Sequence, residues 1–161
     1  MALFSNSDLI RSIDAHIFTG DDDDTNGGGT DADVYLGIAG REFRLSFDND
    51  HWLEPGDDDH FIFGIGGNTS DAKYNDPTDP QLSIGDVLDN IHNVYVRMNV
   101  RVSEYEDPWH VERVHVTVNG FQGPSVSFIA LDGDSSQWLG YDYGLILYLK
   151  RTDHHINDGT N

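Results

Sequence analysis

The chain has 161 residues, of which 37% are apolar, with 17 glycines, five prolines and no cysteine. This length fits one globular domain with its own hydrophobic core, and the lack of cysteine excludes disulfides and thiolate metal sites. The 29 acidic residues against nine lysines and arginines give a net charge of −20. This charge repels phosphate backbones and argues against nucleic-acid binding.

Apolar residues alternate with other residues in eight segments. In chain order these are 13–17, 34–38, 43–47, 61–65, 94–102, 114–118, 126–128 and 145–149. A period of two predicts strands with one buried and one wet face, which is typical of antiparallel sheets. The sequence therefore predicts an all-β fold, a two-sheet antiparallel β-sandwich of about eight strands, with a helical turn possible only within 83–91.

The sandwich is expected to occupy residues 10–150 as one domain, with polar tails at 1–9 and 151–161. The longest apolar stretches, 128–131 and 145–149, are too short to span a bilayer, so no transmembrane segment is expected. The N-terminus has no basic start followed by an apolar stretch, so no secretion signal is visible. The sequence therefore does not indicate the cellular compartment of the protein.

Acidic residues gather in alternate connections between the expected strands. If the strands run up and down, the connections after strands one, three, five and seven lie at the same end. These connections, 19–32, 48–59, 103–110 and 132–143, hold 46 residues and 17 of the 29 acids. A surface adapted only to high salt would not favour one end, so the clustering indicates a cation site. Oxygen-rich adjacent loops suit calcium, which takes six to eight oxygen ligands at about 2.3–2.6 Å.

Several motifs, in this order, resemble those of PLAT/LH2 domains, the C2-like β-sandwich modules of lipoxygenases, pancreatic lipases and polycystins. The motifs lie at 19–21, 29–38, 45–49 and 54–63. The later segments 93–97, 105–109, 111–120 and 137–140 are similar to the membrane-binding domain of clostridial phospholipase C toxins. The resemblance covers about residues 10–150 and implies a calcium-binding module that lacks the toxins' catalytic domain.

The resemblance also implies a ligand set for calcium. In the toxins the ion is held by a loop that ends in Gly-Thr-Asp, by an Asp-Asn loop and by an aspartate before the sixth strand. Carried over by motif, the expected ligands are Gly29, Thr30, Asp31, Asp48, Asn49, Asp50 and Asp107. The toxins have one more aspartate where this chain has Gly27, so Asp24 is the candidate for that missing ligand.

Aromatic side chains are expected beside this site. Tyr105 and Trp109 flank Asp107 in a loop that otherwise contains Ser, Glu, Asp and Pro. Because little core is expected at that end, we predict that both rings are exposed and contact a membrane interface or a protein partner. Trp52 and Trp138 are expected to be core or loop anchors.

Eight histidines raise the question of catalysis, but the sequence contains no Gly-x-Ser-x-Gly elbow, no His-Glu-x-x-His and no cysteine. His16 and His115 are expected on outward strand faces, and the His154-His155 pair lies in the tail, where adventitious metal binding is possible. We therefore expect no catalytic residues and no enzymatic activity. A hydrolase that uses histidine is the least favoured of three hypotheses.

The leading hypothesis is a calcium-binding module that docks on a lipid or membrane surface once calcium has neutralised the acidic end. The alternative is a protein-interaction or structural module with a halophile-like acidic surface. In that module calcium would only rigidify loops. Lipid binding measured with and without calcium separates the two hypotheses.

Overall fold

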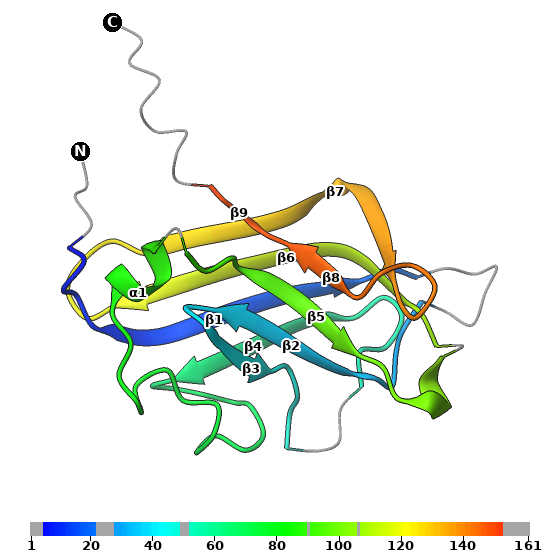
Figure 1. Cartoon of the computed structure of the whole chain (residues 1–161), viewed down its shortest axis with the longest axis horizontal. Helices are drawn as coiled ribbons and strands as arrows, with labels where there is room; N and C mark the ends of the chain where they lie inside the picture. The colour runs from blue at the N-terminus through cyan, green and yellow to red at the C-terminus, as the bar shows by residue number, and fades with distance from the viewer. Residues whose placement is uncertain (1–4, 22–27, 49–51, 90, 106, 153–161) are drawn as a thin grey trace, which may run out of the picture.

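The computed structural model describes residues 5–21, 28–48, 52–89, 91–105 and 107–152. Within these residues, nine strands form two antiparallel sheets that pack face to face (Figure 1). The arrangement confirms the predicted all-β sandwich. It also fits the alternation of the sequence, because each strand gives one face to the core and the other to solvent.

The two sheets contain five and four of the described strands. In spatial order, the five-stranded sheet is β4 (Asp58–Gly64), β1 (Ile10–Thr19), β6 (Trp109–Gly120), β7 (Val126–Leu139) and β9 (Lys150–Arg151). The four-stranded sheet is β3 (Arg41–Arg44), β2 (Asp33–Ile38), β5 (Tyr95–Asn99) and β8 (Ile146–Tyr148). A short 3-10 helix, η1 (Val102–Glu104), precedes β6.

The core fills the space between the two sheets. Phe43 of β3 and Phe63 of β4 are fully buried, and their ring centroids lie 5.4 Å apart, so this pair joins one sheet to the other. Ile17 and Leu36 are also fully buried. Apolar burial at about 25 cal/mol per Å² makes this layer the main stabilising element of the fold.

The described segment 146–151 differs from the expected single strand at 145–149. It forms two strands, β8 and β9, which belong to different sheets. The crossing occurs at Leu149, whose side chain is buried and whose N–H donates to the Val94 carbonyl at 2.8 Å. An alternating apolar pattern cannot reveal such a crossing, because the buried leucines face the same core from either sheet.

Strand β7 is longer than expected and continues through residues 132–139, which were expected to belong to a connection. Gln137 pairs with Val111 and Leu139 pairs with Trp109, beyond two register shifts near Arg113. A bulge interrupts the regular alternation, so a strand that passes through it carries no period-two signal.

A single short helix, α1 (Ile84–Leu88), occupies the window where a helical turn was possible. Its N-cap Ser83 accepts from the Asp86 N–H, and the Asp86 carboxylate accepts from the Ser83 N–H, which is a complete capping box. Within the described residues no helix is both long enough and apolar enough to cross a membrane.

Asp8, within the expected N-terminal tail at 1–9, is bound to the sandwich. Asp8 is buried, and its Oδ2 accepts from the Gly123 N–H at 2.6 Å. Its backbone carbonyl accepts from the Ile84 N–H at 2.8 Å. Backbone N–H groups satisfy this carboxylate and so permit its burial. The sequence could not indicate this burial, because the donors come from residues more than 100 positions away.

The outer face of the four-stranded sheet carries a bidentate ion pair. The Arg97 Nε and Nη2 atoms donate to the two Glu42 carboxylate oxygens at 2.7 and 3.0 Å. The Tyr95 hydroxyl also donates to Glu42, at 3.2 Å. The hydrogen bond from Arg97 lowers the pKa of the Glu42 carboxyl, and the bond from Tyr95 acts in the same direction.

We expect Glu42→Gln to lower the free energy of unfolding at neutral pH and to have little effect at acid pH. Because the native pKa lies below the unfolded one, the stabilisation is complete above the unfolded pKa and is lost as the pH falls through the native pKa. Urea unfolding at pH 7 and pH 3, with Arg97→Gln and the double variant, measures the coupling. An equal loss in the free energy of unfolding at both pH values would contradict a stabilising role for the charged Glu42 carboxylate.

Candidate cation site at the loop end

Four connections meet at one end of the sandwich, which we call the loop end: 20–32, 45–57, 100–108 and 140–145. A β-bridge between Thr30 and Leu53 joins the first two. Hydrogen bonds from Thr30 to Asp107 join the first to the third, and stacked Tyr105 and Tyr141 rings join the third to the fourth. The loop end lies at the opposite end of the sandwich from α1 (Figure 1). The predicted parity of the connections is therefore confirmed.

The loop end is strongly acidic. By sequence its four connections contain 13 aspartates and glutamates, and Arg101 is the one arginine or lysine among them. At physiological ionic strength, exposed charges act on one another over about 8 Å. Neighbouring carboxylates in these loops therefore repel one another, and a bound cation would relieve that repulsion.

Three of the predicted ligand residues lie together. The Asp107 Oδ2 atom accepts from the Asp31 N–H at 2.7 Å and from the Thr30 hydroxyl at 3.1 Å. The Thr30 hydroxyl oxygen also accepts from the Ala32 N–H at 3.1 Å. These bonds fix the Asp107 carboxylate against the backbone of the Thr-Asp motif, although the two segments lie 76 residues apart in sequence.

Gly29 has a packing role that the sequence did not indicate. A side chain at this position would collide with the Leu53 carbonyl oxygen, at 2.5 Å from the Cβ. Glycine therefore permits the close approach of the 20–32 and 45–57 connections, next to the Thr30–Leu53 bridge.

Among the other predicted ligands that the structure describes, Gly29 adjoins Thr30 in the chain, but Asp48 does not join the group. Asp48 is exposed, and no hydrogen bond or ion pair between described residues joins it to Thr30, Asp31 or Asp107. The remaining candidates, Asp24, Asn49 and Asp50, lie outside the described residues. Across the described part of the chain, no three His, Asp or Glu side chains already form a group that could hold a metal ion.

His110 of β6 is hydrogen-bonded to Gly20 and Gly28 of the 20–32 connection, which the sequence did not indicate. Its carbonyl accepts from the Gly20 N–H and its N–H donates to the Gly28 carbonyl, both at 2.7 Å. Gly28 has φ +78°, a conformation that favours glycine, and a side chain at Gly20 would overlap the imidazole. The imidazole stacks on Trp138 with centroids 4.6 Å apart.

Of the two aromatic residues expected to be exposed, only Tyr105 is. Tyr105 is 41% exposed, but Trp109 is fully buried and its indole N–H donates to the Thr19 hydroxyl at 3.1 Å. The expected exposure of the Trp109 ring is therefore wrong. The error arose because residue 109 begins a long strand, so its side chain faces the core.

Other aromatic residues occupy the exposed positions at the loop end. Tyr141 is 59% exposed and stacks on Tyr105 with ring centroids 4.2 Å apart, and Tyr143 is 60% exposed. Trp52, expected to be an anchor, is also exposed, whereas Trp138 is half-buried against His110. The sequence could have indicated that Tyr141 and Tyr143 are exposed, because both lie between Gly140 and Gly144 in a connection outside the strands.

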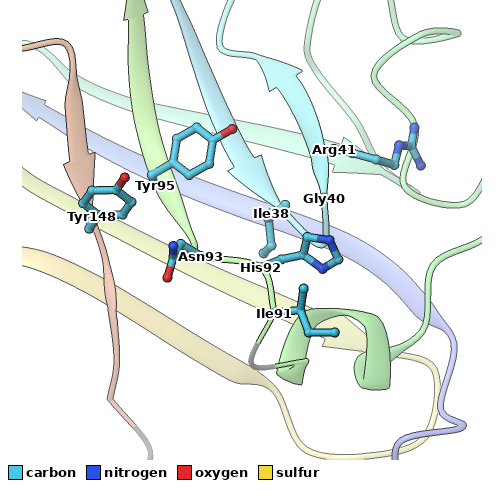
Figure 2. A pocket seen from close by; sticks show the side chains of 8 residues that line it. All are labelled: Ile38, Gly40, Arg41, Ile91, His92, Asn93, Tyr95 and Tyr148. Atoms are coloured by element: carbon cyan, nitrogen blue, oxygen red, sulfur yellow. The ribbon is translucent and has the colours of Figure 1, made fainter.

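A separate hollow lies at the opposite end of the sandwich, with a volume of about 200 Å³ (Figure 2). It is bounded by the β2–β3 turn, by residues 91–93 and by Tyr95 and Tyr148. No acidic residue lines it, so it offers none of the carboxylates that the cation hypothesis requires.

Comparison with solved structures shows that the fold of this chain is similar to a part of two larger proteins. A lipoxygenase structure (Delta413-417:GS LOX) matches 88% of this chain with a TM-score of 0.53 and 16% identity. Clostridium perfringens alpha-toxin from an avian strain matches 91% with a TM-score of 0.54 and 20% identity. The chain spans 16% of the lipoxygenase chain and 33% of the toxin chain. No family model and no curated protein matches the sequence.

Proposed function

We propose that the chain is a binding module, without catalytic activity of its own, whose loop end binds calcium and then docks on a lipid surface. One juxtaposition carries the proposal. Asp107, held by Thr30 and Asp31, lies two residues from Tyr105, whose ring stacks on exposed Tyr141. An ion bound at Asp107 would therefore sit beside two aromatic rings that are free to enter a membrane interface.

The donor chemistry of this group fits calcium. Carboxylate, hydroxyl and carbonyl oxygens are the ligands of this hard cation, and Asp31, Asp107 and Thr30 offer them on two adjacent connections. A complete shell needs further oxygens, which we assign to Asp48, Asn49 and Asp50, to Asp24 and to the backbone at Gly29. Binding must draw these groups together, since the described side chains are not already gathered around an ion.

Charge explains why docking would depend on calcium. A chain with net charge −20 is repelled by anionic lipid, and its loop end is rich in carboxylates. Each calcium ion adds two positive charges there and can share an open coordination position with a lipid phosphate. The neutralised loop end is then the surface best able to approach a membrane.

A second candidate function has its own supporting observation. Hydrogen bonds from Thr30 and Asp31 to Asp107 tie two connections together. A calcium ion at this place could therefore serve only to stiffen the loops of a protein-interaction or structural module.

We expect the double variant Tyr105→Ala/Tyr141→Ala to weaken calcium-dependent vesicle binding about tenfold, which corresponds to roughly 1.4 kcal/mol of lost interfacial burial. Co-sedimentation with vesicles of phosphatidylcholine and phosphatidylserine, with calcium or with a chelator, measures this effect. Tyr74→Ala is the matched control, because Tyr74 is 74% exposed but lies outside the loop end.

The outcomes separate the two functions. Binding that requires calcium and falls in the tyrosine double variant, but not in Tyr74→Ala, supports lipid docking. Calcium-dependent stabilisation with no vesicle binding favours the module in which the ion only stiffens loops. Vesicle binding that is equal in calcium and in chelator contradicts the calcium mechanism.

A further inference from the structure

Three histidines lie side by side on the outer face of the five-stranded sheet. In the strand registers His60 of β4 pairs with His16 of β1, and His16 pairs with His115 of β6. Residues directly opposite in neighbouring strands point to the same face of a sheet. In sequence, His60 is 44 positions and His115 is 99 positions from His16. Only the pairing of the strands brings the three histidines into one row.

Two aspartates on the same face accompany the row. The His16 Nε2 atom lies 2.8 Å from Asp58 Oδ1, and the His60 Nε2 atom lies 3.9 Å from Asp14 Oδ2. The His16 and His60 ring centroids are 4.9 Å apart. Both histidine side chains are 48% exposed and His115 is exposed too, so all three imidazoles can turn without disturbing the core.

We propose that this face binds a divalent transition-metal ion such as Zn²⁺ through His60, His16 and His115, with the carboxylate of Asp58 as the fourth ligand. Imidazole nitrogen is a preferred ligand of zinc, copper and nickel, at about 2.0–2.1 Å for zinc. The His16 and Asp58 contact already sets a nitrogen beside a carboxylate oxygen, which is the position an ion would share.

Strand spacing permits one ion to reach all three imidazoles. Neighbouring strand backbones lie about 4.8 Å apart, so the Cα atoms of His60 and His115 lie roughly 10 Å apart, with the Cα atom of His16 midway between them. Imidazoles leaning inward from both sides can meet an ion above the central strand. In their present rotamers the described side chains do not form such a group, so binding must turn the exposed rings.

This site differs in chemistry and place from the proposed calcium site. Its main ligands are nitrogens on three paired strands, whereas the loop end offers oxygens on connections. Calcium has little affinity for imidazole, so the two sites are independent. Failure of one proposal therefore leaves the other standing.

The test uses the chain with His154→Ala and His155→Ala as background, because that adjacent pair could bind metal by itself. Calorimetric titration with ZnCl₂ at pH 7.5 in excess calcium is expected to show one site. His16→Asn, His60→Asn and His115→Asn should each weaken it at least about tenfold. His92→Asn, which changes an exposed histidine outside the row, should leave it unchanged. Cobalt(II), substituted for zinc, should give the visible absorption of a tetrahedral site.

Each outcome decides the proposal. A zinc site that disappears in the three row variants and persists in His92→Asn supports it. Zinc binding of equal strength and stoichiometry in the triple row variant overturns it and leaves only adventitious binding elsewhere. Displacement of zinc by calcium also overturns it, because the ion would then occupy an oxygen site. Circular dichroism of each variant confirms that the sheet is intact.

Discussion

Trp109→Ala is expected to lower the free energy of unfolding by about 3–5 kcal/mol, the largest effect of any single substitution considered for this chain. The indole is fully buried at the start of β6, and its N–H donates to the Thr19 hydroxyl at 3.1 Å. Truncation removes a large apolar side chain from the place where β6 meets the end of β1. Denaturant unfolding followed by circular dichroism measures the loss.

Two further variants separate packing from hydrogen bonding at this position. Thr19→Val keeps the volume but leaves the buried indole N–H without its acceptor, which should cost about 1–3 kcal/mol. Trp52→Ala serves as the control, because Trp52 is 39% exposed and its loss should cost under about 1 kcal/mol. Equal destabilisation by Trp109→Ala and Trp52→Ala would show that Trp109 is not a core residue in solution.

Calcium at a hundredfold excess over its Kd is expected to raise the free energy of unfolding by about 2.7 kcal/mol, because a ligand that binds only the native state adds RT ln(1 + [L]/Kd). Asp31→Ala, Asp48→Ala and Asp107→Asn should each reduce this gain. The asparagine at position 107 can still accept the bonds from Thr30 and Asp31, so this variant loses charge while the loop contact can persist. Thermal melts with CaCl₂ measure the gain.

Two controls distinguish a calcium site from general screening of charge. NaCl at the same ionic strength should stabilise the chain much less, since a specific site responds to the ion and not to ionic strength. Asp79→Ala, at an exposed aspartate outside the loop end, should keep the full calcium gain. Equal increases in melting temperature with CaCl₂ and with NaCl would contradict a specific calcium site.

The sequence by itself determined the class of fold, because the period of its apolar residues is a local property. Val114 and Val116 alternate with polar neighbours, and in the structure both face the core from β6. The sequence also indicated which end would be acidic, since in an up-and-down sandwich the parity of the connections follows from the order of the strands. Thr30, Asp31 and Asp107 do meet there.

Tertiary structure alone decided which aromatic residues are exposed at the loop end. Trp109 and Tyr105 stand in the same polar stretch, yet a strand that begins at residue 109 buries one and leaves the other outside. Tertiary structure also decided that His16, His60 and His115 form a row. Burial and contacts across strands depend on pairing between segments far apart in the chain, and a pattern of neighbouring residues does not encode the register of that pairing.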